Sequence, residues 1–279
     1  MFSLNLNKIN DDQMLGEGRF GAVYPYQKDP EDLKWVVKYI FAKTDKILLQ
    51  TLNEIILGFS CEHESIVPIR GYNIQKREKR PGYDIYMKMP RMKETLKQVI
   101  QDKIEKITPF KEEEILNIFY SLVCGLEYLH SKKIVHRDIK PENILFDDKN
   151  KAKLSDIGIA KFVADDETSY LDHDRSGTPY YVAPELQIYN PDFQKKEFYK
   201  TDIWSLGVVI AELCLFEIKF IDKISNDLKE IEKKMIQLEE KFSSTLVDIL
   251  RGILKSDPKK RMQLQEVKTM IEKIIVNKR

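Results

Sequence analysis

The stretch His136-Arg137-Asp138-Ile139-Lys140-Pro141-Glu142-Asn143-Ile144-Leu145 is the most informative part of the 279-residue chain, and Asp156-Ile157-Gly158 begins thirteen positions after Asn143. This polar segment and the motif after it supply two aspartates, an amide, a lysine and an arginine in close succession. Their order suits phosphoryl transfer, which needs a base to orient a hydroxyl, a cation to neutralise the moving phosphate, and oxygen ligands for Mg²⁺. A polar loop with solvated charges is the simpler alternative, but such a loop seldom combines all of these groups.

The composition is that of a globular protein with balanced charge. Hydrophobic residues make up 42% of the chain, and 46 basic side chains face 45 acidic ones, for a net charge of +1. This balance gives no indication of a nucleic-acid partner. The three scattered cysteines lack metal-ligand spacing and favour a reducing compartment. The longest apolar run, 206–216, contains Glu212 and is too short to span a bilayer, and the N-terminus lacks a signal-peptide pattern. We therefore expect a cytoplasmic protein without membrane insertion, and a nuclear location also fits.

Short runs of β-branched and aromatic residues, separated by turn residues, predict strands in the first third of the chain. Residues 45–60 break this pattern with the spacing of an amphipathic helix. The strands are expected at 14–15, 22–24, 35–40, 66–69 and 83–87, with a solvated turn over 75–82.

Helical spacing dominates from residue 108 onward. Thr108-Pro109 predicts a helix cap followed by a first-turn proline. The change from strands to helices near residues 90–95 predicts two lobes joined by a short hinge. The fold class is therefore α+β, with a small β-rich lobe that has one key helix and a larger, mainly helical lobe. The apolar stripe of the first long helix consists of Ile115, Phe119, Leu122, Leu126 and Leu129, and later helices are expected at 202–215, about 227–241, 245–254 and 264–276.

Two features of the first lobe predict a phosphate-binding site. Gly16-Glu17-Gly18-Arg19-Phe20-Gly21 is followed by the strand-forming Ala22-Val23-Tyr24, so a glycine-rich hairpin over phosphates fits better than the turn of a dinucleotide-binding fold. Glycines let backbone N–H groups approach phosphate oxygens. Lys38 lies in an apolar strand, and Glu54 on the following helix offers the carboxylate that would hold it toward phosphates. A surface lysine with a buried stem is the alternative for Lys38.

In their order along the chain, these motifs resemble those of the eukaryotic protein kinase family, serine/threonine type, over essentially the whole sequence. The resemblance implies a bilobal catalytic domain over residues 1–279, with an N-lobe to about residue 89, a hinge at about 90–94 and a C-lobe over about 95–279. It also implies ATP and Mg²⁺ as cofactors, with Mn²⁺ as an alternative, and a protein substrate. The shared segments are Gly16–Gly21, Lys38, Glu54, His136–Asn143, Asp156–Gly158, Ala183-Pro184-Glu185, Asp202–Gly207 and Arg261.

The resemblance assigns chemistry to the polar segment and to the residue that begins the next motif. Asp138 would be the catalytic base, and Lys140 would contact the transferred phosphate. Tyrosine kinases lack a lysine at the position of Lys140, so serine/threonine specificity is implied. Asn143 and Asp156 would ligate Mg²⁺, a hard cation that prefers oxygen donors.

The resemblance also implies structural roles. Asp202 would hold the backbone of the polar segment, and Glu185 would pair with Arg261. Both roles concern how the C-lobe is held together rather than the transfer chemistry.

The adenine site is expected at the hinge. Met89 would be the gatekeeper and Met92 would supply the adenine-binding amide; Pro90 is acceptable because only its carbonyl is used. A shift of one or two residues would instead make Met87 or Lys88 the gatekeeper. The other implied ATP contacts are Leu15, Gly16, Gly18, Gly21, Val23, Val36, Lys38 and Leu145.

The sequence departs from the family pattern around the helix that carries Glu54. Ile157 replaces the usual phenylalanine, and Gly58 stands where a larger apolar side chain is usual. Together they remove volume from a stack whose other members would be Ile69 and His136. We expect a mobile helix, a weaker lysine–glutamate pair, and a modest basal activity that a regulatory protein partner or ligand raises.

The activation segment carries a second departure. Arg137 and Lys161 resemble a pair of cations that clamp an activation-loop phosphate. The position that usually carries this phosphate holds Asp174, which is either a fixed carboxylate partner or a solvated loop residue. Ser176 is a candidate phosphorylation site, and Thr178 also belongs to this segment.

Two other functions are compatible with parts of the pattern. A pseudokinase, a nucleotide-binding scaffold with weak or no transfer activity, usually lacks at least one of the catalytic residues retained here. A small-molecule kinase of related fold generally lacks the Ala183-Pro184-Glu185 motif and the lysine at position 140. The pattern favours an active serine/threonine protein kinase over both.

Overall fold

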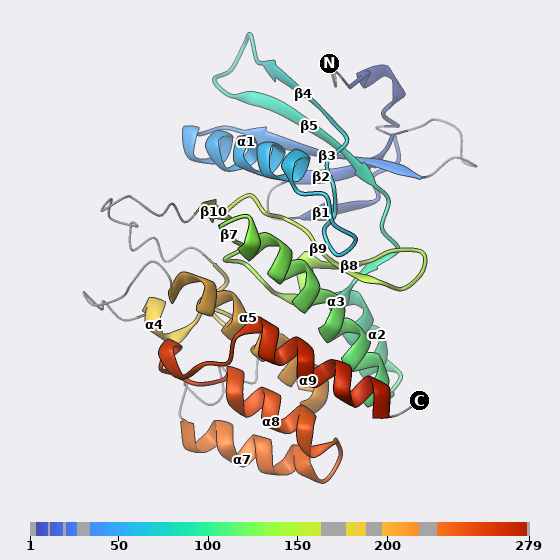
Figure 1. Cartoon of the computed structure of the whole chain (residues 1–279). Helices are drawn as coiled ribbons and strands as arrows, with labels where there is room; N and C mark the ends of the chain where they lie inside the picture. The colour runs from blue at the N-terminus through green and yellow to red at the C-terminus, as the bar shows by residue number, and fades with distance from the viewer. Residues whose placement is uncertain are drawn as a thin grey trace.

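The computed structural model describes residues 4–10, 12–18, 21–26, 34–162, 177–187, 197–217 and 228–277. Within them, a five-stranded antiparallel sheet and one long helix form the small lobe, and a mainly helical lobe lies beneath it (Figure 1). The predicted α+β class with two lobes is confirmed.

The small-lobe sheet has the strand order β1-β2-β3-β5-β4. Gly18 pairs with Gly21 in the antiparallel β1–β2 ladder, so both ends of the glycine string lie on paired strands, as predicted. The helix α1 begins after Thr44, whose side chain accepts a hydrogen bond from the Ile47 N–H and caps the first turn. The small-lobe elements are β1 (Gly16–Gly18), β2 (Gly21–Pro25), β3 (Trp35–Ala42), α1 (Asp45–Ser60), β4 (Gly71–Lys76) and β5 (Tyr83–Pro90), after a short 3-10 helix, Leu6–Lys8.

The prediction of a strand at 66–69 is wrong. Only an isolated bridge forms here, between Ile66 and Leu154 of the large lobe, because Pro68 lacks the N–H that a ladder would need. The Val67 N–H donates to the Leu154 carbonyl at 2.9 Å, and the Leu154 N–H donates to the Ser65 carbonyl at 2.8 Å. The loop after α1 is therefore fastened to the large lobe, and the sheet edge beside β5 is formed by β4.

The large lobe packs around α3 and α5. All five residues of the predicted apolar stripe on α3 are 0% exposed, which confirms that stripe. Nearly the whole of α5 is buried, including Trp204. No helix of the described ranges has the length and apolar character that crossing a bilayer demands. The large-lobe elements are β6 (Glu94–Thr95), α2 (Leu96–Glu105), α3 (Glu112–Ser131), β7 (Ile134–Val135), β8 (Ile144–Phe146), β9 (Ala152–Leu154), β10 (Lys161–Phe162), α4 (Pro184–Gln187), α5 (Phe198–Leu215), α7 (Leu228–Glu239), α8 (Ser244–Ile253) and α9 (Leu264–Asn277), with 3-10 turns at Pro141–Asn143 and Pro258–Lys260.

Two helix starts differ from expectation. The cap predicted at Thr108-Pro109 is wrong, because α3 begins at Glu112 and the Glu114 carboxylate accepts the Lys111 N–H at 2.8 Å. The helix α2 was not predicted from the apolar spacing; its start is fixed by a capping box between Thr95 and Gln98.

A buried ion pair joins α4 to the end of the large lobe. Both terminal nitrogens of Arg261 donate to the Glu185 carboxylate at 2.7 Å, and the Arg261 guanidinium lies 5.1 Å from the centre of the Trp204 ring. Further Arg261 donors reach the carbonyls of Lys255 and Lys200. The predicted Glu185–Arg261 pair is confirmed.

We predict that Arg261→Ala lowers the free energy of unfolding by about 3–5 kcal/mol, because it leaves the Glu185 carboxylate buried without its partner. Urea unfolding followed by circular dichroism measures the loss. The matched control is Arg251→Ala, which removes a more exposed arginine paired with Glu232 and Glu239 and should cost at most about 1 kcal/mol. Equal losses in the two variants would contradict the prediction.

Candidate active site

The buried carboxylate of Asp202, on α5, holds the start of the polar segment. It accepts the backbone N–H of His136 at 2.8 Å and that of Arg137 at 2.9 Å, and lies 2.9 Å from Nε2 of His130. Arg137 has a φ of 71°, a conformation that costs a non-glycine residue free energy unless its surroundings enforce it. The expected role of Asp202 in holding this backbone is confirmed.

The side chain of Asp138 lies at the centre of a compact polar cluster. Its Oδ2 accepts from Lys140 Nζ at 2.5 Å and from Asn143 Nδ2 at 2.9 Å, while its Oδ1 accepts from the Thr178 hydroxyl at 2.9 Å. Lys140 Nζ also donates to the Thr178 hydroxyl at 2.8 Å. Three residues expected to act together are thus in contact. Thr178, which the sequence placed only in the activation segment, joins them.

Asn143 and Asp156 are brought to neighbouring positions. The Ser155 N–H donates to the Asn143 carbonyl at 2.9 Å, so Asn143 lies beside the residue that precedes Asp156. The amide nitrogen of Asn143 donates to the backbone carbonyl and to Oδ2 of Asp138, both at 2.9 Å, so its amide oxygen is directed away from that carboxylate. Burial alone would raise the pKa of Asp156, but the charges of Lys38, His136 and Lys140 hold it below its ordinary value. An ionised carboxylate and an amide oxygen are a donor set that fits a hard divalent cation.

Lys38 connects the two lobes through its charge. Its Nζ lies 2.7 Å from one oxygen of Glu54 and 3.1 Å from the other, and 3.7 Å from Oδ1 of Asp156. Burial would lower the pKa of Lys38, but the carboxylates of Asp156 and Glu54 raise it above its ordinary value. The lysine is therefore a fixed cation between Glu54 of α1 and Asp156, two residues after the end of β9, and a snorkelling surface position is excluded.

Two glycines of the hairpin have different reasons to be glycine. A Cβ on Gly21 would lie 1.8 Å from the Tyr39 carbonyl oxygen, so Gly21 is required by the close approach of β2 to β3. A Cβ on Gly16 would meet nothing within 4 Å. Packing does not explain the glycine at position 16, whereas a phosphate approaching the backbone would. Gly18 pairs with Gly21 through its backbone.

Residues 9–270 match the protein kinase domain family. The chain belongs to the protein kinase family. It is 29% identical over 270 residues to CBL-interacting protein kinase 28 of Oryza sativa subsp. japonica, and 31% identical over 261 residues to serine/threonine-protein kinase Nek5 of Mus musculus. These alignments cover 92% and 89% of this chain but 57% and 38% of the relatives. The chain therefore spans little more than half of the length of these relatives, or less. Kinases of this family use ATP and a divalent cation.

The strand register groups the predicted ATP contacts of this kinase domain on one face of the sheet. Val23 lies opposite Lys38, and Val36 lies opposite Met89, so these side chains share a face. Lys88 points to the other face, where its Nζ lies 4.4 Å from the Tyr26 ring centre and 4.5 Å from that of Trp35. A gatekeeper at Lys88 does not fit this arrangement. The assignment of Met89, Pro90 and Met92 to the adenine site stays a prediction, as do the contacts of Leu15 and Leu145.

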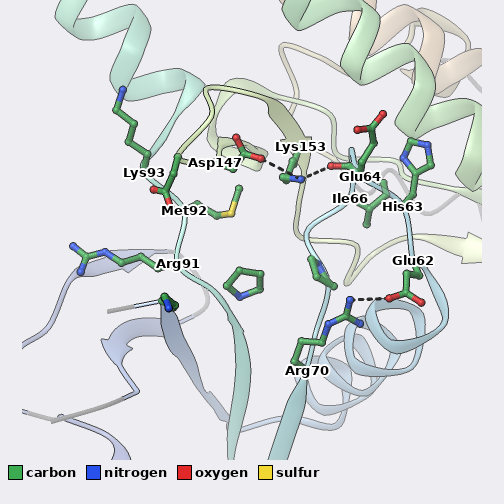
Figure 2. A pocket seen from close by; sticks show the side chains of 14 residues that line it. Glu62, His63, Glu64, Ile66, Arg70, Arg91, Met92, Lys93, Asp147 and Lys153 are labelled. Carbon is green, nitrogen blue, oxygen red and sulfur yellow. Dashed lines mark hydrogen bonds and ion pairs between the residues drawn. The ribbon is translucent and has the colours of Figure 1, made fainter. Parts of the chain in front are cut away.

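A groove of about 950 Å³ lies between the hinge, the α1–β4 loop and the β8–β9 turn (Figure 2). Pro90 and Met92 are part of its lining, but Lys38 and Asp156 are not, so this groove is distinct from the site of the lysine–glutamate pair. Charged side chains in it neutralise one another: Figure 2 shows Arg70 beside Glu62, 2.9 Å apart, and Lys153 beside Asp147. The groove contains none of the residues of the Asp138 cluster or of the lysine–glutamate pair.

The expected loss of packing around Gly58 does not occur. A Cβ on Gly58 would lie 2.6 Å from two side-chain carbons of Ile69, so the Ile69 side chain already fills the space above this glycine. Ile157 is 3% exposed and belongs to the large hydrophobic core. The lysine–glutamate pair is formed, and the weaker pair and modest basal activity inferred from these substitutions stay predictions.

The activation segment is described in part. The Arg137 side chain donates to the Ile159 carbonyl at 3.4 Å, and Lys161 opposes Val135 in the β10–β7 ladder. Asp174 and Ser176 lie outside the described residues. The clamp between these cations and Asp174 therefore stays a prediction.

We predict that Gly58→Ala lowers the free energy of unfolding by about 1–3 kcal/mol, because its new methyl group collides with Ile69. Ile69→Ala alone should cost about 2–5 kcal/mol through the cavity that it leaves. In the double variant, the methyl group at position 58 enters this cavity, so the combined loss should be smaller than the sum. Urea unfolding of the three variants measures the coupling, and strictly additive losses would refute it.

A second prediction concerns Asp202 and pH. Burial alone would raise the pKa of Asp202, but hydrogen bonds from His130 and the Arg137 N–H hold it below its ordinary value. The unfolded chain then binds more protons near pH 4, close to the unperturbed aspartate pKa of about 3.9, so this contribution to stability is present above that pH and is lost on acidification.

Asp202→Asn should lower the free energy of unfolding at pH 7 by about 1–3 kcal/mol. It should also reduce the decline in stability from about pH 5 down to about pH 3, where Asp202 of the unfolded chain takes up its proton. Urea titrations at these pH values test both effects. A variant with the same pH dependence as the wild type would show that Asp202 does not titrate as described.

Proposed function

We propose that this protein is a serine/threonine protein kinase that transfers the γ-phosphate of ATP to hydroxyl groups of protein substrates. The observation that carries the proposal is the cluster of Asp138, Lys140, Asn143 and Thr178. Each carboxylate oxygen of Asp138 accepts a hydrogen bond from at least one of the other three side chains. Membership of the protein kinase family supports the same conclusion. A nucleotide-binding scaffold has no observation in its favour among the described residues.

Asp138 is the proposed catalytic base. Its carboxylate is held from both sides, by the Thr178 hydroxyl on one oxygen and by Lys140 and Asn143 on the other. A substrate hydroxyl that donates to this carboxylate is oriented for attack, and the proton leaves along the same hydrogen bond. Lys140 lies beside the carboxylate, where its positive charge balances the negative charge that develops during transfer.

Asn143 and Asp156 are the proposed Mg²⁺ ligands, through the amide oxygen and the ionised carboxylate described above. When bound, ATP and Mg²⁺ supply the phosphoryl group and the charge that neutralises its oxygens. Lys38, fixed by Glu54, is the proposed contact to the α- and β-phosphates. The absence of any packing reason for Gly16 supports a glycine hairpin that lies over the phosphates.

We predict that wild-type protein phosphorylates peptides containing serine or threonine but not tyrosine, and that Asp138→Asn lowers kcat about 10²–10⁴-fold. Transfer of radiolabelled phosphate from ATP to a positional peptide library measures both outcomes. Asp138→Asn should still gain thermal stability on addition of Mg-ATP, because the proposed nucleotide contacts remain.

The matched control is Asp102→Asn, which removes a carboxylate from a surface pair with Lys106 on α2 and should leave kcat unchanged. Transfer rates that are equal in wild type and Asp138→Asn would overturn the proposal. Phosphorylation confined to tyrosine would refute the serine/threonine assignment.

A further inference from the structure

The turn that follows Asp156 is held by a side chain that the catalytic pattern does not include. Asn53 precedes Glu54 on α1, and its Nδ2 donates to the Ala160 carbonyl at 2.8 Å and to the Gly158 carbonyl at 3.3 Å. The amide group thus joins α1 of the small lobe to the 156–160 turn of the large lobe.

The surroundings leave little room for this turn to move. A Cβ on Gly158 would lie 3.4 Å from a Glu54 carboxylate oxygen and 3.5 Å from the Gln50 carbonyl, so α1 and the turn are in direct contact. The Ala160 N–H donates to the Ile157 carbonyl at 3.1 Å, and Arg137 reaches the Ile159 carbonyl. The carbonyls of the turn are therefore bound from inside the turn, from the polar segment, and from α1.

Asn53 and Glu54 are neighbours on α1, and both stabilise one charge group, which consists of Lys38, Glu54 and Asp156. Glu54 holds Lys38, whose Nζ lies 3.7 Å from Asp156, while Asn53 holds the backbone two and four residues after Asp156. Asp156 itself has a φ of 60°, a left-handed conformation that its neighbours must enforce. A bond across the lobes at this point restrains both the position of α1 and the backbone that aims the Asp156 carboxylate.

We infer that Asn53 is a positioning residue for phosphoryl transfer. It holds α1 against the 156–160 turn and thereby keeps Lys38, Glu54 and Asp156 in their mutual positions. This role extends the proposed function and depends on it for its kinetic consequence. It also gives the chain a polar fastening at a place where Ile157 and Gly58 depart from the family pattern.

The test compares Asn53→Ala and Asn53→Asp with the wild type. Alanine removes the donor, and aspartate places a carboxylate against two carbonyl oxygens. A net hydrogen bond corresponds to about a threefold to tenfold change in an equilibrium, so kcat should fall by about this factor in Asn53→Ala and further in Asn53→Asp. The KM for the peptide substrate should stay within about twofold, because the inferred role of Asn53 is in aligning the charge group.

The matched control is Asn73→Ala on the edge strand β4, where the Asn73 amide donates to the Leu4 carbonyl at 3.3 Å. It removes the same kind of bond away from the cleft, and kcat should equal that of the wild type. Equal kcat values for Asn53→Ala and Asn73→Ala would overturn the inference. A lower melting temperature of Asn53→Ala with unchanged kcat would overturn it as well, since the residue would then be only structural.

Hydrogen exchange gives a readout that needs no activity. Amides of residues 157–161 should exchange about threefold to tenfold faster in Asn53→Ala than in Asn73→Ala, while amides of α5 keep their wild-type rates. If the wild-type protein transfers no phosphate, the proposed kinase function fails, and the exchange rates still decide the inference. Unchanged exchange in the turn would show that Asn53 does not hold it.

Discussion

One buried carboxylate organises the candidate active site of this protein. Asp202 is 1% exposed, and its two oxygens bind the N–H groups of His136 and Arg137 and the ring of His130. Because α5 is buried along nearly its whole length, the carboxylate is a fixed point rather than a flexible side chain. The backbone of the polar segment, and with it the direction of Asp138, is set by this helix.

A second set of charges joins the small lobe to the large lobe. Lys38 on β3, Glu54 on α1 and Asp156 after β9 form a chain of opposite charges that crosses from one lobe to the other. Each charge would be costly to bury alone, and together they offset that cost only in one geometry. The three charges therefore depend on how the two lobes are placed. They are all in contact only when α1 lies against the 156–160 turn.

The sequence was sufficient to predict those features that depend on the type of a residue and on its place in the order of the motifs. The shift from strands to helices predicted the two lobes, and the resemblance of the ordered motifs to protein kinases implied the Asp202 contact and the Glu185–Arg261 pair. The sequence was insufficient to predict how side chains pack against one another. Ile69 was expected in the same stack as Gly58, but the space above Gly58 was predicted to be loosely filled; the Ile69 side chain occupies it, and the sequence does not report how closely two side chains fit.

The same limit explains the errors in the small lobe and the residues that were missed. Residues 66–69 have the composition of a strand, yet they pair with β9 because the end of α1 delivers them to the large lobe. Asn53 was missed because an asparagine beside a helical glutamate reads as a solvated side chain. Thr178 was assigned to the activation segment but not to the Asp138 cluster, because sequence separation hides that contact.

The fastening of residues 65–67 to Leu154 makes the helix α1 a lever. Its C-terminal end, with Leu57 and Cys61 in the large core, is the pivot, and Glu54 lies about 10 Å from Cys61 at 1.5 Å of rise per residue. A rotation of about 10° around that pivot displaces Glu54 by nearly 2 Å, enough to separate it from Lys38. The displacement grows along the helix toward Thr44, so a contact made at that end needs the least force to move Glu54 relative to Lys38.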